Sequence, residues 1–129
     1  MEVLQSRILL RPRDPERTRR FYGETLELSV YREFSGGVVY FLGGGFLEIS
    51  GRADVAATDA TATDATQLWI QVRDVEATHA RLEGQGVPID EPPVDKPWGL
   101  RELRARDPDG RRLIFVQVPA DHPLRRDRR

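Results

Sequence analysis

Few side chains in this sequence have the chemistry of a nucleophile or a metal ligand. The sequence contains no cysteine, which excludes disulfides, thiolate metal sites and cysteine nucleophiles. We expect His79, in a predicted helix, to be solvated, and His122, in a terminus rich in proline and arginine, to be disordered. No serine has a base at a recognisable spacing. Glu48 remains, and in apolar surroundings its carboxylate could act as a general base.

Charge and length argue against several classes of partner. The 129 residues include 20 basic and 21 acidic ones, so the charges nearly cancel and give no general attraction to nucleic acid or anionic membrane. No apolar run approaches the roughly 20 residues that span a bilayer. Residues 1–5 lack the basic and apolar regions of a signal peptide. We therefore expect a cytoplasmic domain that binds neither nucleic acid nor membrane.

The first half of the sequence predicts the element order β-α-β-β-β. Asp14 is a good N-cap and Pro15 suits the first position of a helix that should run to about Leu26. Short apolar runs, separated by prolines or by the glycine turns Gly36-Gly37 and Gly43-Gly44-Gly45, predict strands at 3–10, 28–34, 38–42 and 46–50.

The second half repeats this order. Residues 53–66 contain only Ala, Asp, Thr and one Val, which predicts a linker or mobile loop, with a short helix as the alternative. Asp74 then caps a helix over about 75–83, and the remaining strands are predicted at 67–72, from 87, at 100–105 and at 113–118. The chain is thus a duplicated module.

Several motifs in a fixed order carry a family resemblance. They are "FYGETLEL", "FLEIS", "LWIQVRDVEATHARLEGQGV" and "PWGLRELRARDPDG", the last ending in a strong turn sequence. Over residues 3–118 the chain resembles the vicinal oxygen chelate superfamily, which includes glyoxalases, ring-cleaving dioxygenases and bleomycin-resistance proteins. The resemblance implies an α+β fold of two tandem βαβββ modules whose sheets curl around a shared cavity, commonly in a homodimer.

The same resemblance sets the expected organisation of the chain. It implies one domain over 1–118, and places module one at 1–52, the linker at 53–66 and module two at 67–118. Residues 119–129 are predicted to be a disordered basic tail.

Enzymes of this family hold a divalent metal with four ligands, one on the first and one on the last strand of each module. The matching positions here are Arg7, Glu48, Gln67 and Ile114. Only Glu48 is an orthodox ligand and Gln67 is a weak one, whereas Arg7 brings a permanent cation and Ile114 has no lone pair. We therefore predict that the chain holds no metal and needs no other cofactor.

If those positions face the cavity, strand alternation gives one mixed face and one apolar face on each sheet. The predicted mixed face carries Arg7, Leu9, Arg11, Phe46, Glu48, Ser50, Gln67, Trp69, Gln71, Ile114 and Val116. Arg7 and Glu48 could instead pair as a structural ion bridge, and Trp69 could be core filler. The side on which Tyr40 lies is left open.

Two further features, one near Trp98 and one at Glu27, follow from the resemblance. Trp98, Gly99 and Arg101 match a stretch at the cavity mouth of bleomycin-resistance-like members, so they are a candidate ligand wall, or Trp98 only caps the core. Glu27 stands where the family usually has glycine, so either Glu27 takes a left-handed backbone or the helix ends differently.

The leading hypothesis is a metal-independent protein that sequesters a planar, partly cationic or zwitterionic small molecule, as antibiotic-resistance members of the family do. Glu48 would favour a cationic group, because the long Arg7 side chain can swing toward solvent; if Arg7 dominates instead, the preference inverts toward carboxylates. The alternatives are an enzyme (lyase, isomerase or dioxygenase) with Glu48 as base or metal ligand, and a non-catalytic partner module. The predicted ligand-binding residues are Arg7, Phe46, Glu48, Gln67, Trp69, Trp98, Arg101 and Ile114.

Overall fold

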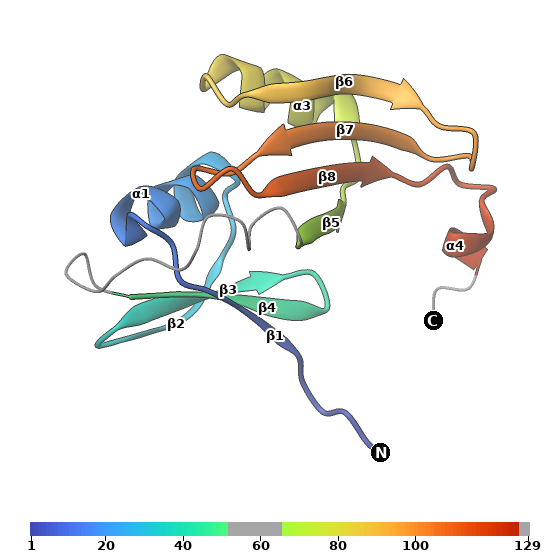
Figure 1. Ribbon diagram of the computed structural model, residues 1–129. Coiled ribbons are helices and arrows are strands. Elements are labelled where there is room, and N and C mark those ends of the chain that lie inside the picture. Colours follow the sequence, from blue (N-terminus) through green and yellow to red (C-terminus); the bar gives the residue numbers. More distant parts are fainter. Residues whose placement is uncertain (52–65, 127–129) are drawn as a thin grey trace. The chain divides into compact units, whose positions relative to one another are not determined.

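The structure is a computed structural model that describes residues 1–51 and 66–126 (Figure 1). The chain divides into two compact units, Met1–Ala60 and Thr61–Arg129. Each unit holds a separate four-stranded mixed sheet, and neither sheet is closed. Most of the predicted linker, residues 53–66, lies outside the described residues. No helix in the described part is long and apolar enough to cross a membrane.

Unit 1 has the order of a βαβββ module. Its elements are β1 (Arg7–Leu10), α1 (Pro15–Arg20), the π-helical turn η1 (Phe21–Thr25), β2 (Val30–Phe34), β3 (Gly37–Leu42) and β4 (Gly45–Ser50). The strand order is β1-β4-β3-β2, with β1 parallel to β4 and the other pairs antiparallel. One face of the sheet is buried together with the helical segment, and its core residues are Leu10, Phe21, Tyr22, Val38, Tyr40, Leu47 and Ile49.

Unit 2 repeats that topology. Its elements are β5 (Gln67–Gln71), α3 (Val75–Gly84), β6 (Ile89–Asp95), β7 (Arg101–Arg106), β8 (Arg112–Gln117) and α4 (Pro123–Arg126). The strand order is β5-β8-β7-β6, with β5 parallel to β8. Val75 and Leu82 of α3 are buried, as are Leu103, Leu113 and Phe115 of the sheet. The α+β fold with two βαβββ modules is therefore confirmed.

The helix starts follow the predicted caps. Asp14 accepts a hydrogen bond from the backbone N–H of Arg17 at 3.1 Å, and Asp74 accepts one from that of Ala77 at 3.0 Å. In both cases a side-chain oxygen satisfies one of the first backbone donors of the helix. The two modules thus begin their helices by the same mechanism.

One strand differs from the prediction, and the predicted tail contains a short helix. β6 runs through Pro92-Pro93, with register shifts on both sides of Glu91. An edge strand tolerates proline, because one of its sides has no ladder to break. Within the predicted tail, residues 123–126 form the short helix α4, and just before it the His122 ring bonds the Trp98 carbonyl oxygen at 3.1 Å.

Glu27 takes the left-handed backbone. Its φ is +58°, the one positive φ at a non-glycine position in the described part of the chain. The first of the two predicted alternatives is therefore confirmed. A residue with a Cβ pays about 1–2 kcal/mol for this conformation.

Glu27→Gly is expected to raise the free energy of unfolding by about 0.5–1 kcal/mol, because the strain removed exceeds the chain entropy that glycine adds. Urea denaturation measures the change. The matched control is Glu33→Gly in β2, where the same substitution should destabilise. A lower denaturation midpoint for Glu27→Gly than for the wild type would contradict the strain argument.

Candidate functional site

In unit 1 the predicted mixed face brings an ion pair and aromatic rings together. Arg7 is the register partner of Phe46, and Leu9 is that of Glu48, so these four share one face. The Arg7 guanidinium donates to Glu48 Oε1 at 2.9 Å, and its carbon lies 5.9 Å from the centre of the Phe46 ring. Both charged side chains are largely buried, 28% and 17% exposed. The predicted ion bridge is confirmed.

Three aromatic rings extend this face across the sheet. Tyr31 lies 5.1 Å from Phe41 and 4.6 Å from Phe46, measured between ring centres. A register shift between Val30 and Arg32 in β2 interrupts the regular alternation at Tyr31. Tyr31 and Phe41 remain 45% and 44% exposed, so the rings, which are tilted or edge-on to one another, offer an exposed aromatic surface.

The ion pair changes the expected charge preference. The cationic preference assumed that Arg7 swings into solvent and leaves Glu48 free, and that assumption is wrong. Arg7 instead donates to Glu48 Oε1 and also to Gln5 Oε1 at 3.3 Å. Glu48 therefore does not present an uncompensated negative charge.

In unit 2 the structure gathers three of the predicted residues on one face. Trp69 is the register partner of Ile114, and Gln67 is two residues from Trp69 on the same strand. Trp69 is 49% exposed, which rules out the alternative that it fills the core of its unit. Ile114 packs against a buried apolar cluster of Leu100, Val116 and Val118.

Trp98 joins this face through a buried carboxylate, whereas Arg101 does not. The Trp98 indole N–H donates to Glu102 Oε2 at 2.7 Å, and Glu102 is the register partner of Val116. Arg101, one residue earlier, lies on the opposite face and pairs with Glu76 of α3 at 2.7 Å and with Asp95 at 3.2 Å. The hydrogen bond that Arg101 donates to Glu76, more than the one it donates to Asp95, raises the pKa of Arg101.

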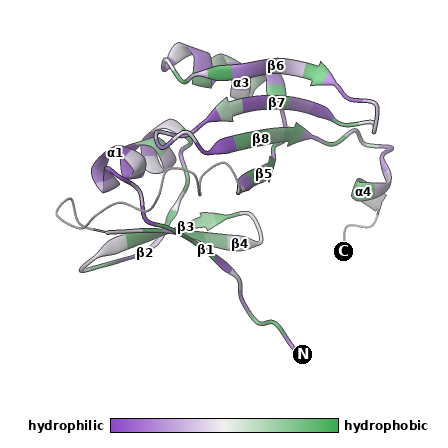
Figure 2. Ribbon diagram, in the orientation of Figure 1, coloured by the Kyte–Doolittle hydropathy of each residue, from purple (hydrophilic) through white to green (hydrophobic). Residues whose placement is uncertain are grey.

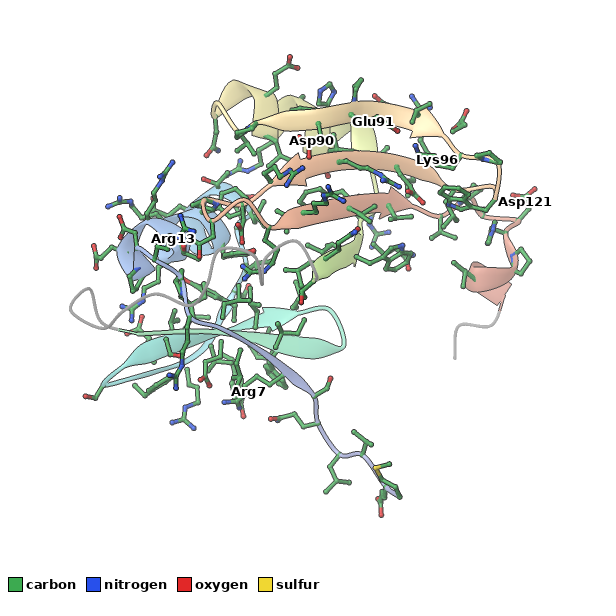
Figure 3. All side chains as sticks on the ribbon, in the orientation of Figure 1. Arg7, Arg13, Asp90, Glu91, Lys96 and Asp121 are labelled. Carbon is green, nitrogen blue, oxygen red and sulfur yellow. The ribbon has the colours of Figure 1, made fainter. Side chains whose placement is uncertain are left out.

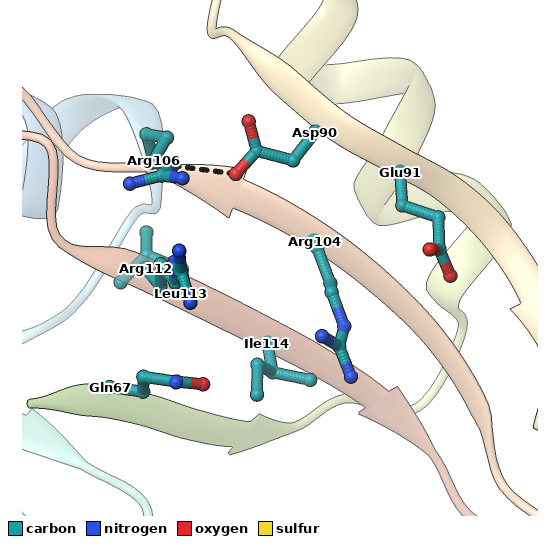
Figure 4. Close-up of a pocket in the computed structure, with 8 residues that line it drawn as sticks. All are labelled: Gln67, Asp90, Glu91, Arg104, Arg106, Arg112, Leu113 and Ile114. Atoms are coloured by element: carbon teal, nitrogen blue, oxygen red, sulfur yellow. Dashed lines mark hydrogen bonds and ion pairs between the residues drawn. The ribbon is translucent and has the colours of Figure 1, made fainter. Parts of the chain in front are cut away.

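A pocket of about 300 Å³ opens on this face of unit 2 (Figure 4). Its lining contains three arginines that the sequence analysis did not single out; the lining residues are Gln67, Asp90, Glu91, Arg104, Arg106, Arg112, Leu113 and Ile114. A signal was present, because Arg104 and Arg106 are two apart in a strand and must share a face. That these two arginines lie next to Ile114 and Arg112 could not be predicted without the register between β7 and β8.

The acidic residues of this pocket are paired. Asp90 accepts from Arg106 Nε at 2.6 Å, and Glu91 pairs with Lys96. The Lys96 hydrogen bond holds the pKa of Glu91 below its usual value, so Glu91 is a carboxylate at neutral pH. Figure 3 labels Asp90 and Glu91 on β6 and Lys96 just after the end of that strand.

Another pocket, of about 430 Å³, lies in unit 1 on the side of the sheet that carries the helical segment. Tyr40 lines it and donates through its hydroxyl to the carbonyl oxygen of Arg19 at 3.2 Å. Burial raises the pKa of Tyr40 above its usual value. Tyr40 therefore faces α1 and not the face that carries Glu48, which settles the side that the sequence left open.

The four positions of the family metal site do not fit a metal ion. Within unit 1, the Glu48 carboxylate is the one orthodox ligand among these positions, and it already accepts a hydrogen bond from the permanent cation Arg7. Within unit 2, Ile114 has no donor atom and Gln67 offers a neutral amide. No group of three His, Cys, Asp or Glu residues that could hold a metal exists among the residues that the structure describes.

Comparison with known proteins agrees with this fold. The bleomycin resistance determinant encoded on the transposon Tn5 is 22% identical, with a TM-score of 0.68, over 90% of this chain and 98% of that one. TioX from Micromonospora sp. ML1 is 24% identical, with a TM-score of 0.69, over 89% and 96% of the two chains. Lactoylglutathione lyase from Agrobacterium tumefaciens is 17% identical, with a TM-score of 0.68, over 91% and 94%. No curated protein matches the sequence.

These structural similarities show the fold, and the family follows from the sequence itself. The model of the Glyoxalase/Bleomycin resistance protein/Dioxygenase superfamily matches residues 5–115, most of the chain and both βαβββ modules. With this match over most of its length and its two βαβββ modules, the chain belongs to this superfamily.

Proposed function

We propose that the chain binds a planar small molecule on its mixed sheet faces, without a metal ion at the four strand positions. The observation that carries this proposal is the 2.9 Å ion pair between Arg7 and Glu48. A divalent ion at Glu48 would have to displace the guanidinium and then remain beside its positive charge, which disfavours metal binding.

Aromatic surface supports the binding role. Tyr31, Phe41 and Phe46 form a cluster in unit 1, and Trp69 is half exposed in unit 2. Aromatic side chains stack on planar ligands with about 0.5–1.5 kcal/mol per ring pair beyond the burial of area. Ligand sites combine such apolar walls with a few polar groups, as these faces do.

The related structures are compatible with two functions for this chain, that of a resistance protein and that of an enzyme. One is named as a bleomycin resistance determinant and another as a lactoylglutathione lyase, and this chain has the fold of both. The donor set supports the binding role, because Arg7 and Ile114 stand at two of the four positions where the family's enzymes have metal ligands. A homodimer, as the family resemblance implies, is part of this proposal.

Purified protein is expected to hold less than one equivalent of divalent metal and to be stabilised by planar compounds after treatment with a chelator. Elemental analysis and a thermal-shift screen, with and without added Zn, Ni, Mn or Fe, measure both. A metal that is present at one equivalent, lost in Glu48→Ala and kept in the control Glu33→Ala, would overturn the proposal. So would stabilisation by planar compounds only when a metal is added.

A further inference from the structure

Three guanidinium groups gather on the pocket face of unit 2 against the usual rule for sheets. Arg106 and Arg112 are register partners on β7 and β8, and Arg104 is two residues from Arg106 on the same face. Like charges directly opposite one another in a sheet are destabilising. A bound anion would remove that repulsion.

The nearby carboxylates neutralise this cluster only in part, because Asp90 pairs with Arg106 alone among the described residues. Glu102 already accepts from Trp98, and its contact with Arg104 is long, 3.4 Å. With Asp90 paired to Arg106 and Glu91 to Lys96, the carboxylates of this face have partners. The pocket lining holds three positive groups, Arg104, Arg106 and Arg112, against two negative ones, Asp90 and Glu91. The ion-pair partners Lys96 and Glu102 add one charge of each sign and leave this excess of one positive charge unchanged.

Two arginines retain capacity to donate. Arg112 is exposed and makes no ion pair or hydrogen bond with another side chain of the described residues. The Nε atom of Arg104 is buried and has no acceptor among those residues. A buried N–H without an acceptor is costly, so this position of the Arg104 side chain lacks full compensation. The side chain as a whole is 40% exposed, which leaves its guanidinium accessible to a ligand.

We propose that this pocket binds the carboxylate of a planar organic acid. Arg104 and Arg112 hold the carboxylate, because the flat guanidinium matches its two oxygens. Trp69 stacks on the ring system, since its register partner Ile114 lines the pocket. A volume of about 300 Å³ is at the small end for ligand pockets and suits one or two fused rings.

This inference rests on the proposed function, because it names the ligand class of one of the two binding faces. Figure 2 shows a difference in composition between the strands of the two sheets: β3 and β4 are mostly green, whereas β7 carries purple segments. Unit 1 supplies apolar surface and a neutralised ion pair, and unit 2 supplies the net positive charge. The charge preference therefore comes from Arg104 and Arg112 and not from Glu48.

Calorimetric titration of the full chain with 2-naphthoate, 2-naphthamide and 2-naphthylmethylammonium tests the charge preference. We expect naphthoate to bind at least tenfold more tightly than the other two, with an affinity that falls as sodium chloride is added. Arg112→Gln and Arg104→Gln should each weaken naphthoate at least tenfold, and Arg112→Lys should weaken it less. The control is Arg73→Gln, an exposed arginine of unit 2 outside the pocket lining, which should bind like the wild type.

Each outcome has a defined meaning. Equal binding of the three naphthalene compounds, or unchanged affinity in both glutamine variants, overturns the carboxylate site and leaves the proposed function standing. Inorganic phosphate that competes as well as naphthoate also overturns it, because the pocket would then select a phosphate group. If none of the three planar compounds binds, the proposed function is contradicted together with the inference.

Discussion

Asp107→Ala is expected to lower the free energy of unfolding by about 3–4 kcal/mol, the cost of removing one partner from a buried ion pair. The Asp107 side chain is fully buried and accepts hydrogen bonds from the backbone N–H groups of Asp109 and Arg111, both at 2.9 Å. It also pairs with the Arg111 guanidinium at 2.8 Å, and that guanidinium is itself only 11% exposed. Alanine would leave two backbone donors and a buried cation without their acceptor.

Urea denaturation of two further variants separates these contributions. Asp107→Asn keeps one oxygen for the two backbone donors but loses the charge and the second oxygen, which accepts from the Arg111 guanidinium, so it should cost less than alanine. Asp95→Ala breaks an exposed ion pair with Arg101 and should cost less than about 1 kcal/mol. An Asp107→Ala variant as stable as Asp95→Ala would contradict the proposed role of Asp107 in closing the turn.

The fold could be predicted because its signals are local. Asp14 and Asp74 cap their helices through contacts with neighbouring residues only. Alternation along a short strand likewise places Leu47 and Ile49 on one face of the sheet and Glu48 on the other. These patterns need only neighbouring residues. The full length of β6 was missed for the opposite reason. Its prolines disfavour a strand locally, and the strand forms because it pairs with β7, which is distant in the sequence.

The site could be predicted only in part, because it depends on register. The sequence placed Arg7, Glu48, Trp69 and Ile114 on the mixed faces, since the family resemblance supplied which positions face the cavity. The strand pairing that sets Trp69 next to Ile114 came from the structure. It did not place Arg112 opposite Arg106, because no motif marks that pair. It also left Arg7 free to turn to solvent, whereas Phe46 and Glu48 hold it in place.

Glycines show the same limit. The sequence assigned Gly37 and Gly45 to turns, and the structure makes each the first residue of a strand. At Gly37 the reason is packing and not a turn conformation. A Cβ atom there would lie 2.3 Å from the carbonyl oxygen of Ile49 and 2.9 Å from the Phe34 ring.

Gly37→Ala is therefore expected to lower the free energy of unfolding by about 3 kcal/mol, at the upper end for an overpacked position. The contact is with backbone of β4, so relief requires β3 and β4 to separate next to Glu48. The matched control is Gly44→Ala, where a Cβ would meet nothing within 4 Å, and its stability should equal that of the wild type to within about 0.5 kcal/mol. Urea denaturation compares the two variants. If both glycines tolerate alanine equally, the close approach of Gly37 to Ile49 does not constrain the sheet that carries Glu48.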